Sequence, residues 1–347
     1  MFRKLLFFFL FLPLLLIPIN FNNISDFEKR LLVGFNLSNF SSFFNDHFPY
    51  REELISSYIF INHSIGVSVH PNLFIGDDGL LFLKSQDNIT DKQRNIIFLN
   101  DSKQENIKKN LELIYDYAEK EGISIYFAAI PDQQTVHYKK LPIWHTKLNN
   151  QDKFNVMQKI FKEIGHENNF IDLRKPLIKF NKQNSPTYYL YESHWTNYGS
   201  MIASKKILNH LNMIDKNMYL FKKMSFVWPD LYLRENLLHV DISNLEIHNK
   251  QLLYEDMNEK YFRYNTKKAI GNDNLLIYGD SFTSENRNFP FYMINNFSSV
   301  SRVSSNHQTL SHSLIKIFEP SIVLICIAER NFFEEALFNS IKNNLIN

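Results

Sequence analysis

The sequence predicts an α/β domain in which helices flank a mostly parallel β-sheet. Short apolar runs of strand length alternate along the chain with longer segments of helical periodicity, as in a parallel sheet with helices on its faces. Two of the short runs, 275–278 and 322–327, contain no polar residue, which is expected for strands that are buried on both faces. With 347 residues, of which 44% are hydrophobic, the chain can bury the core of one large domain.

The expected helices and strands follow from local patterns. Apolar residues recur at helical spacing over 200–211, and Thr196 or Asn197 is a suitable N-cap for that helix. In chain order we expect a helix over 105–121, a strand over 123–130, a helix over 152–164, a short strand over 170–173, the helix over 200–211, and strands over 275–278, 300–303 and 322–327.

The N-terminus carries a hydrophobic segment. Arg3 and Lys4 precede an uninterrupted apolar run from Leu5 to Ile19, which suits a signal sequence or a short anchor. Because the chain has no alanine before Ala118, a small-residue cleavage site is lacking, and we expect an uncleaved signal anchor. A cleaved signal peptide is the alternative. In either case the basic residues orient the rest of the chain away from the cytoplasm.

The domain boundaries follow from these segments. We expect the anchor over 1–22, a membrane-proximal segment over 23–85 and the main domain over 86–347. Between about residues 212 and 272 the alternation gives way to mixed aromatic, Asn and charged residues, which predicts an insertion or small subdomain.

A serine follows one of the expected strands. Gly279-Asp280-Ser281-Phe282 comes directly after the apolar run 275–278, so the turn would present Ser281 at the carboxyl edge of the sheet, where open α/β folds bind ligands. Its own backbone N–H could then face the oxyanion of an attacked ester or thioester. Since Gly, Asp and Ser all favour turns, a turn without catalytic function is the alternative.

A histidine and a carboxylate lie upstream. Glu192 and His194 are two residues apart, so they project to the same side only if residues 188–195 are strand or loop. A packed or surface histidine is the alternative interpretation. Together with Ser281 they provide a nucleophile, a base and an acid that orients the base, and this combination predicts acyl transfer.

Other residues have smaller expected roles. Arg302 could contact the oxyanion or the substrate, although a surface salt bridge is the alternative. We expect Asp280 to hydrogen-bond the turn backbone, and Glu329 and Arg330 to form a structural ion pair near the site. The single cysteine, Cys326, lies in an apolar run and is expected to be an inert core residue.

Composition excludes several classes of function. Lys and Arg total 38 against 36 Asp and Glu, and the resulting net charge of +2 does not indicate a nucleic-acid-binding protein. One cysteine excludes an internal disulfide, and the histidines show no paired metal-ligand spacing. We therefore expect no metal and no cofactor.

The segment from Tyr188 to Gly199, Tyr-Tyr-Leu-Tyr-Glu-Ser-His-Trp-Thr-Asn-Tyr-Gly, resembles the Asp-x-His-Trp-Thr-x-x-Gly segment of the AlgJ/AlgX alginate O-acetyltransferases and the related DHHW-motif proteins. These proteins are SGNH-hydrolase-like, with the acid and histidine before the serine, as in this chain. Weaker similarities extend the resemblance from about residue 40 to 335. The family usually has Asp where this chain has Glu192, which moves the carboxylate by roughly 1.5 Å if nothing compensates.

The resemblance implies an SGNH-hydrolase-like fold and an O-acetyltransferase that acts on an extracytoplasmic polysaccharide through a Ser281 acyl-enzyme, with His194 as base and Glu192 as its partner. It also implies a membrane-bound O-acyltransferase as the acyl donor partner. The N-terminal segment predicts a single-pass inner-membrane protein with its catalytic domain on the periplasmic or extracytoplasmic side. Two alternatives remain open, which are a carbohydrate esterase with the same triad and a non-catalytic polysaccharide-binding assembly protein.

Overall fold

The computed structural model describes residues 51–84, 86–181, 186–190, 192–213, 247–255, 260–266 and 271–346. The expected anchor over 1–22 lies outside the described residues. The chain divides into two compact units between Val69 and His70, and the described part of the first unit holds helix α4 (Arg51–Ser64). No helix within the described ranges combines the length and the apolar character needed to cross a membrane.

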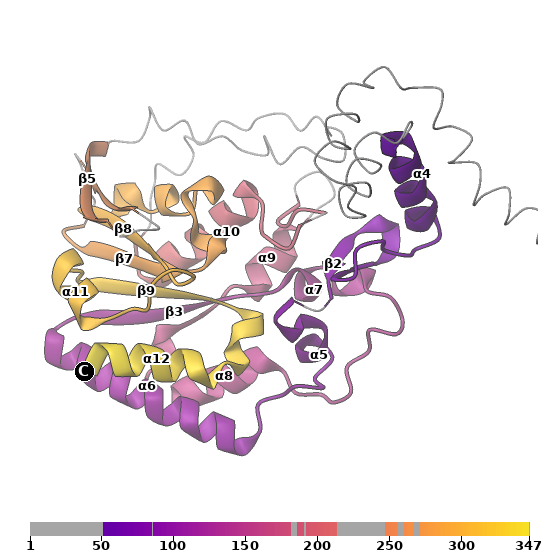
Figure 1. The fold of residues 1–347 in the computed structure, drawn as a ribbon. Helices are drawn as coiled ribbons and strands as arrows, with labels where there is room; N and C mark the ends of the chain where they lie inside the picture. The colour runs from indigo at the N-terminus through magenta and orange to yellow at the C-terminus, as the bar shows by residue number, and fades with distance from the viewer. Residues whose placement is uncertain are drawn as a thin grey trace, which may run out of the picture. The chain divides into compact units, whose positions relative to one another are not determined.

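The second unit is built around a mixed sheet that has seven strands within the described residues, in the order β4-β3-β9-β7-β8-β6-β5 (Figure 1). The pairs from β4 to β8 are parallel, whereas β6 and β5 extend the edge in antiparallel orientation. The strands are β3 (Ser124–Ile130), β4 (Phe170–Asp172), β5 (Ile247–Glu255), β6 (Lys260–Thr266), β7 (Asn274–Gly279), β8 (Ser299–Ser304) and β9 (Ile322–Ala328). The prediction of a mostly parallel sheet is confirmed.

Helices cover both faces of this sheet. One face packs against α6 (Asp101–Glu121), α8 (Lys153–Glu163), α11 (His312–Phe318) and α12 (Glu335–Ile346). The other face packs against α9 (Arg174–Phe180), α10 (Asn197–His210) and the short turns that follow β7. Figure 1 shows these two layers on either side of the strands. Successive residues of β7 contribute to opposite layers, since Leu276 belongs to the first core and Ile277 to the second.

Smaller elements complete the unit. The hairpin of β1 and β2 has its own small core of Phe74, Leu80 and Phe82, and it was not predicted from the sequence. The remaining described elements are β1 (Leu73–Ile75), β2 (Leu81–Leu83), α5 (Ile89–Gln93), α7 (Gln133–Val136) and the 3₁₀ turns η2 (Asp77–Gly79), η3 (Gln86–Asn88), η4 (Tyr138–Lys140), η5 (Glu167–Asn169), η8 (Ser281–Thr283), η9 (Glu285–Arg287), η10 (Pro290–Tyr292), η11 (Ile294–Asn296) and η12 (Glu329–Phe333).

The expected helices and strands are confirmed, with small differences at their ends. Helix α6 begins at Asp101, earlier than expected, because the Asn100 side chain accepts a hydrogen bond from the Lys103 N–H at 2.9 Å and caps the helix. It ends where Gly122 adopts a left-handed conformation with φ of 67°. The stretch expected as an insertion contributes β5 and β6, while its residues 214–246 lie outside the described residues.

The last residue of β7 approaches its neighbours closely. A Cβ added to Gly279 would lie 2.7 Å from Thr283 Cγ2 and 3.0 Å from the Cβ of Cys326 on the adjacent strand β9. Glycine therefore allows the chain to turn sharply after β7 while packed against β9. Cys326 itself is buried, as predicted from its apolar run.

Candidate active site

Ser281 follows β7 at the carboxyl edge of the parallel strands. It is exposed to solvent and begins the 3₁₀ turn η8. The preceding Asp280 accepts a hydrogen bond from the Phe282 N–H at 3.0 Å through its side chain, which confirms its expected role in the turn. The same edge receives the residues that follow β3 and β9, because these strands run parallel to β7.

His194 lies in a loop that folds back on itself. Tyr188 and Trp195 form an isolated antiparallel bridge, and the Tyr189 N–H donates to the His194 carbonyl at 3.1 Å. Helix α10 then begins at Asn197, where the Thr196 hydroxyl accepts from the Gly199 N–H at 3.1 Å. The prediction that Glu192 and His194 lie outside a helix is therefore confirmed.

Trp195 attaches this loop to the serine turn. Its indole N–H donates to the Phe282 carbonyl at 2.9 Å, and its buried ring stacks on Phe289 with 5.4 Å between ring centroids. The Tyr188 hydroxyl also donates to the carbonyl of Pro131, which directly follows β3. The position of His194 beside Ser281 is thus fixed by its neighbours in the loop.

The loop also passes very close to the start of α10. A Cβ on Gly199 would lie 2.0 Å from the Thr187 carbonyl oxygen. Because that atom belongs to the backbone, it cannot move aside by a change of rotamer. Gly199 therefore allows the first turn of α10 to pack against the backbone at Thr187, where the chain enters the loop.

The structure brings the three predicted residues together. His194 Nε2 lies 2.6 Å from Ser281 Oγ, and His194 Nδ1 lies 2.7 Å from Glu192 Oε1. The second contact has a poor angle for a straight hydrogen bond, although the atoms are close. The side chains of His194 and Glu192 are 20% and 22% exposed, so the site is open on one side.

These contacts define a chemical capability. The neutral imidazole that suits them carries its proton on Nδ1, facing Glu192, and leaves Nε2 free to accept the Ser281 proton. This is the arrangement in which a serine hydroxyl attacks an acyl carbon while a histidine removes its proton.

Arg287 is a further charged residue at the site, and it was not identified from the sequence. Its guanidinium donates to Glu192 Oε1, the same oxygen that faces His194. Burial opposes ionisation of Glu192, but the contacts with His194 and Arg287 outweigh it and lower the pKa of the carboxyl to about 2. Glu192 is therefore ionised at neutral pH.

This depressed pKa predicts a pH-dependent contribution to stability. The contribution is fully present above the unfolded pKa of 4.5 and is lost as the pH falls through about 2. We expect the difference in unfolding free energy between wild type and Glu192→Gln to shrink from pH 5 to pH 3, by at most about 1.4 kcal/mol per pH unit. Urea unfolding at several pH values measures it. A difference that stays constant over this range would contradict the pairing.

Arg302 lies in β8 and contacts the turn that carries Ser281. Its Nε donates to the Thr283 hydroxyl at 3.1 Å, and its guanidinium also donates to the Asp280 carbonyl at 3.2 Å. Arg302 therefore links strand β8 to the turn η8 and stabilises that turn. A direct contact with the oxyanion or substrate stays a prediction.

The prediction that Glu329 and Arg330 pair with each other is wrong, because each pairs with a different residue. Arg330 Nε lies 2.9 Å from Asp132 Oδ1, whereas Glu329 Oε1 lies 3.7 Å from Lys153 Nζ. Both residues begin the 3₁₀ turn η12, in which consecutive side chains project about 120° apart, so each meets a different neighbour. All four side chains are buried.

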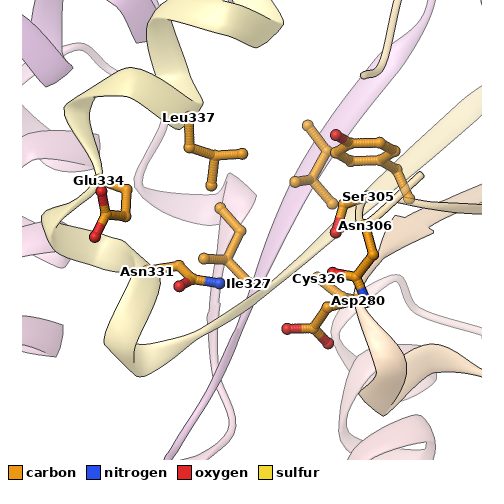
Figure 2. Close-up of a pocket in the computed structure, with 10 residues that line it drawn as sticks. Asp280, Ser305, Asn306, Cys326, Ile327, Asn331, Glu334 and Leu337 are labelled. Carbon is orange, nitrogen blue, oxygen red and sulfur yellow. The ribbon is translucent and has the colours of Figure 1, made fainter. Parts of the chain in front are cut away.

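A cavity of about 180 Å³ lies beside the serine turn. Figure 2 shows Asp280 and Asn306 on one side of it, Asn331 and Glu334 on the other, and Ile327 between them. Burial raises the pKa of the Asp280 carboxyl, against the opposing effect of its backbone hydrogen bond and nearby cations. The part of the chain that the structure describes contains no group of three or more His, Cys, Asp or Glu side chains placed to hold a metal ion.

No family model and no curated protein matches the sequence. Solved structures with a similar arrangement include PatB1 of Bacillus cereus with a sulfonyl adduct, at 14% identity and a TM-score of 0.49, covering 66% of this chain and 91% of PatB1. The O-acetyltransferase domain of Pseudomonas putida AlgJ has 14% identity and a TM-score of 0.47, over 79% of this chain and 99% of the domain.

A DHHW family protein from Eubacterium siraeum has 14% identity and a TM-score of 0.45, over 70% of this chain and 90% of that protein. AlgJ and the DHHW protein thus bear the names of the group that the segment from Tyr188 to Gly199 resembles in sequence.

Proposed function

We propose that this chain is a serine-dependent O-acyltransferase, which transfers acetyl groups to hydroxyls of an extracytoplasmic polysaccharide through an acyl-enzyme on Ser281. The observation that carries the proposal is the contact of 2.6 Å between Ser281 Oγ and His194 Nε2, with Glu192 at the other ring nitrogen. A serine paired in this way is a nucleophile for acyl carbon.

The reaction proceeds in two halves. First, His194 Nε2 takes the Ser281 proton as Oγ bonds to the acyl carbon, and the leaving group departs with that proton to give an ester on Ser281. Second, His194 removes a proton from a sugar hydroxyl, whose oxygen attacks the ester. The Ser281–acyl bond then breaks, and the serine oxygen recovers a proton from His194. The backbone N–H of Ser281 is the proposed oxyanion donor.

Two observations support an SGNH-hydrolase-like site in which the acid and the histidine precede the serine in the chain. Glu192 and His194 precede Ser281 in the chain, as in the family that the sequence resembles, and Ser281 follows a central parallel strand. The exposed position of Ser281 suits an acceptor hydroxyl on a large polymer.

The cellular setting is part of the proposal. The apolar run from Leu5 to Ile19 supports an inner-membrane anchor with the catalytic domain in the periplasm. One hydrophobic segment cannot carry acyl groups across a bilayer, so we propose a membrane-bound O-acyltransferase as the donor partner.

A carbohydrate esterase is the second candidate, because the exposed Ser281 is also accessible to water. Water in place of the sugar hydroxyl in the second half-reaction would release acetate. Both candidates share the acyl-enzyme, so only the fate of the acyl group distinguishes them.

The test uses the full-length protein in detergent with a chromogenic acetyl ester, with and without an acceptor oligosaccharide. We expect serine-dependent turnover that is lost in Ser281→Ala and retained in Ser284→Ala, with acetyl found on the sugar by mass spectrometry. Acetate released to water alone would favour the esterase. Folded protein without turnover, and without modification of Ser281 by a sulfonyl fluoride, would favour a binding protein.

A further inference from the structure

A single short segment contacts both His194 and Glu192 of the loop over residues 188–195, called the histidine loop below. Ser281 at its start contacts His194, and Arg287 at its end contacts Glu192. The turns η8 and η9 between them are closed by hydrogen bonds from the Thr283 N–H to the Asp280 carbonyl at 3.1 Å and from the Arg287 N–H to the Ser284 carbonyl at 3.0 Å. The nucleophile and Arg287 are therefore held at a fixed separation.

The carboxylate of Glu192 is oriented by Arg287. The guanidinium makes a hydrogen bond to Oε1, whereas the contact of 2.7 Å from His194 Nδ1 to that oxygen is poorly aligned. Both partners are largely shielded from water, with 15% of the Arg287 side chain exposed. A charge-assisted hydrogen bond in such surroundings is among the stronger polar contacts of proteins.

Arg287 is itself held by the histidine loop. Its guanidinium carbon lies 5.2 Å from the centre of the Tyr189 ring, which is within cation–π distance. The backbone N–H of Tyr189 donates to the His194 carbonyl. The loop that positions His194 therefore also positions the cation that binds Glu192.

A glutamate needs such support more than an aspartate does. Its side chain has one more rotatable bond, so that more conformational freedom must be lost to hold the carboxylate beside His194. The planar guanidinium fixes both the position and the direction of a bound carboxylate oxygen, which the compact ammonium of lysine does less well.

We propose that Arg287 is a positioning residue of the triad, which acts through Glu192 to hold the carboxylate beside His194. The site is then a unit of four residues, Ser281, His194, Glu192 and Arg287. This inference rests on the proposed function. The lowered pKa of Glu192 agrees with it.

The test is a double-mutant cycle in the full-length protein, measured by turnover of the chromogenic acetyl ester. We expect Arg287→Gln to lower kcat by about tenfold to a hundredfold with KM changed less than about twofold, because only the transition state needs the oriented histidine. In a Glu192→Gln background the same change should lower kcat by less than about twofold. Arg287→Lys should recover part of the activity. If Arg287→Gln does not fold, Arg287→Lys replaces it in the cycle.

Arg174→Gln is the matched control. Arg174 has a similarly shielded side chain and pairs with Asp152 and Asp172, outside the site. Its loss should lower the melting temperature while kcat stays within about twofold of wild type. An equal loss of kcat from Arg287→Gln in both backgrounds, a rise in KM alone, or no effect would overturn the inference.

A spectroscopic measurement separates this inference from the proposed function. The proton NMR signal of His194 Nδ1–H reports the contact with Glu192 even if the protein has no ester turnover. We expect Arg287→Gln to shift this signal upfield and Arg174→Gln to leave it unchanged. An unchanged signal in Arg287→Gln would overturn the role of Arg287, whereas absence of serine-dependent turnover in wild type would overturn only the proposed function.

Discussion

Replacing His194 with alanine is expected to lower the rate of Ser281 acylation by roughly 10³-fold or more while leaving the protein folded. The loss follows because the serine hydroxyl is 2.6 Å from His194 Nε2 and would have no base to take its proton. The fold should persist because the loop is held by the Trp195 indole, the Tyr188 hydroxyl and backbone hydrogen bonds.

The rate of modification by a sulfonyl fluoride, followed by mass spectrometry, measures this effect without an acceptor sugar. The matched control is His210→Ala, because His210 is half-buried and contacts the Asn168 carbonyl at 2.6 Å. His210→Ala should react within about twofold of wild type. If His194→Ala reacted within about tenfold of wild type, His194 would not be the base.

Ser281, His194 and Glu192 could be singled out because each lies in a segment with a local signal. The apolar run before Gly279 identifies a strand end, and the residues after it must lie at one edge of the sheet. The spacing of Glu192 and His194 requires an extended segment, and the bridge between Tyr188 and Trp195 provides one. These patterns place Ser281 at the sheet edge and His194 in a loop. That the two meet was predicted from the chemistry that requires a nucleophile beside a base, and from the resemblance of residues 188–199 to a known family.

The partners of Arg330 and Glu329 could not be predicted in the same way. They depend on the strand order, which places β3 beside β9 and so brings Asp132 next to Arg330. Sequence adjacency suggested that the two residues pair with each other, but their side chains leave the turn in different directions. Ion pairs between distant segments have no local pattern from which to predict them.

Arg287 and the antiparallel edge were missed for related reasons. Arg287 lies in a short 3₁₀ turn, whose path is set by hydrogen bonds to its own neighbours and has no hydrophobic periodicity. Strands β5 and β6 come from a stretch of mixed aromatic, Asn and charged residues. Antiparallel strands need not be apolar on both faces, so they lack the continuous run that identified the central parallel strands.

The second large effect is expected at the buried pair of Asp132 and Arg330. Their side chains are 0% and 8% exposed, and Asp132 also accepts a hydrogen bond from Gln93 at 3.1 Å. Replacing Arg330 with methionine would leave the Asp132 charge buried without its cation. We expect a loss of about 3–5 kcal/mol in the free energy of unfolding, measured by urea denaturation.

The double variant Asp132→Asn/Arg330→Met decides whether this loss comes from an uncompensated charge. Neutralising Asp132 as well removes the charge that costs stability, so the double variant should be more stable than Arg330→Met alone. Lys316→Met is the matched control, because its pair with Glu121 is largely exposed on the lysine side and should contribute about 0–1 kcal/mol. If the double variant were less stable than Arg330→Met, lost packing around Arg330 rather than the unpaired carboxylate would explain the effect.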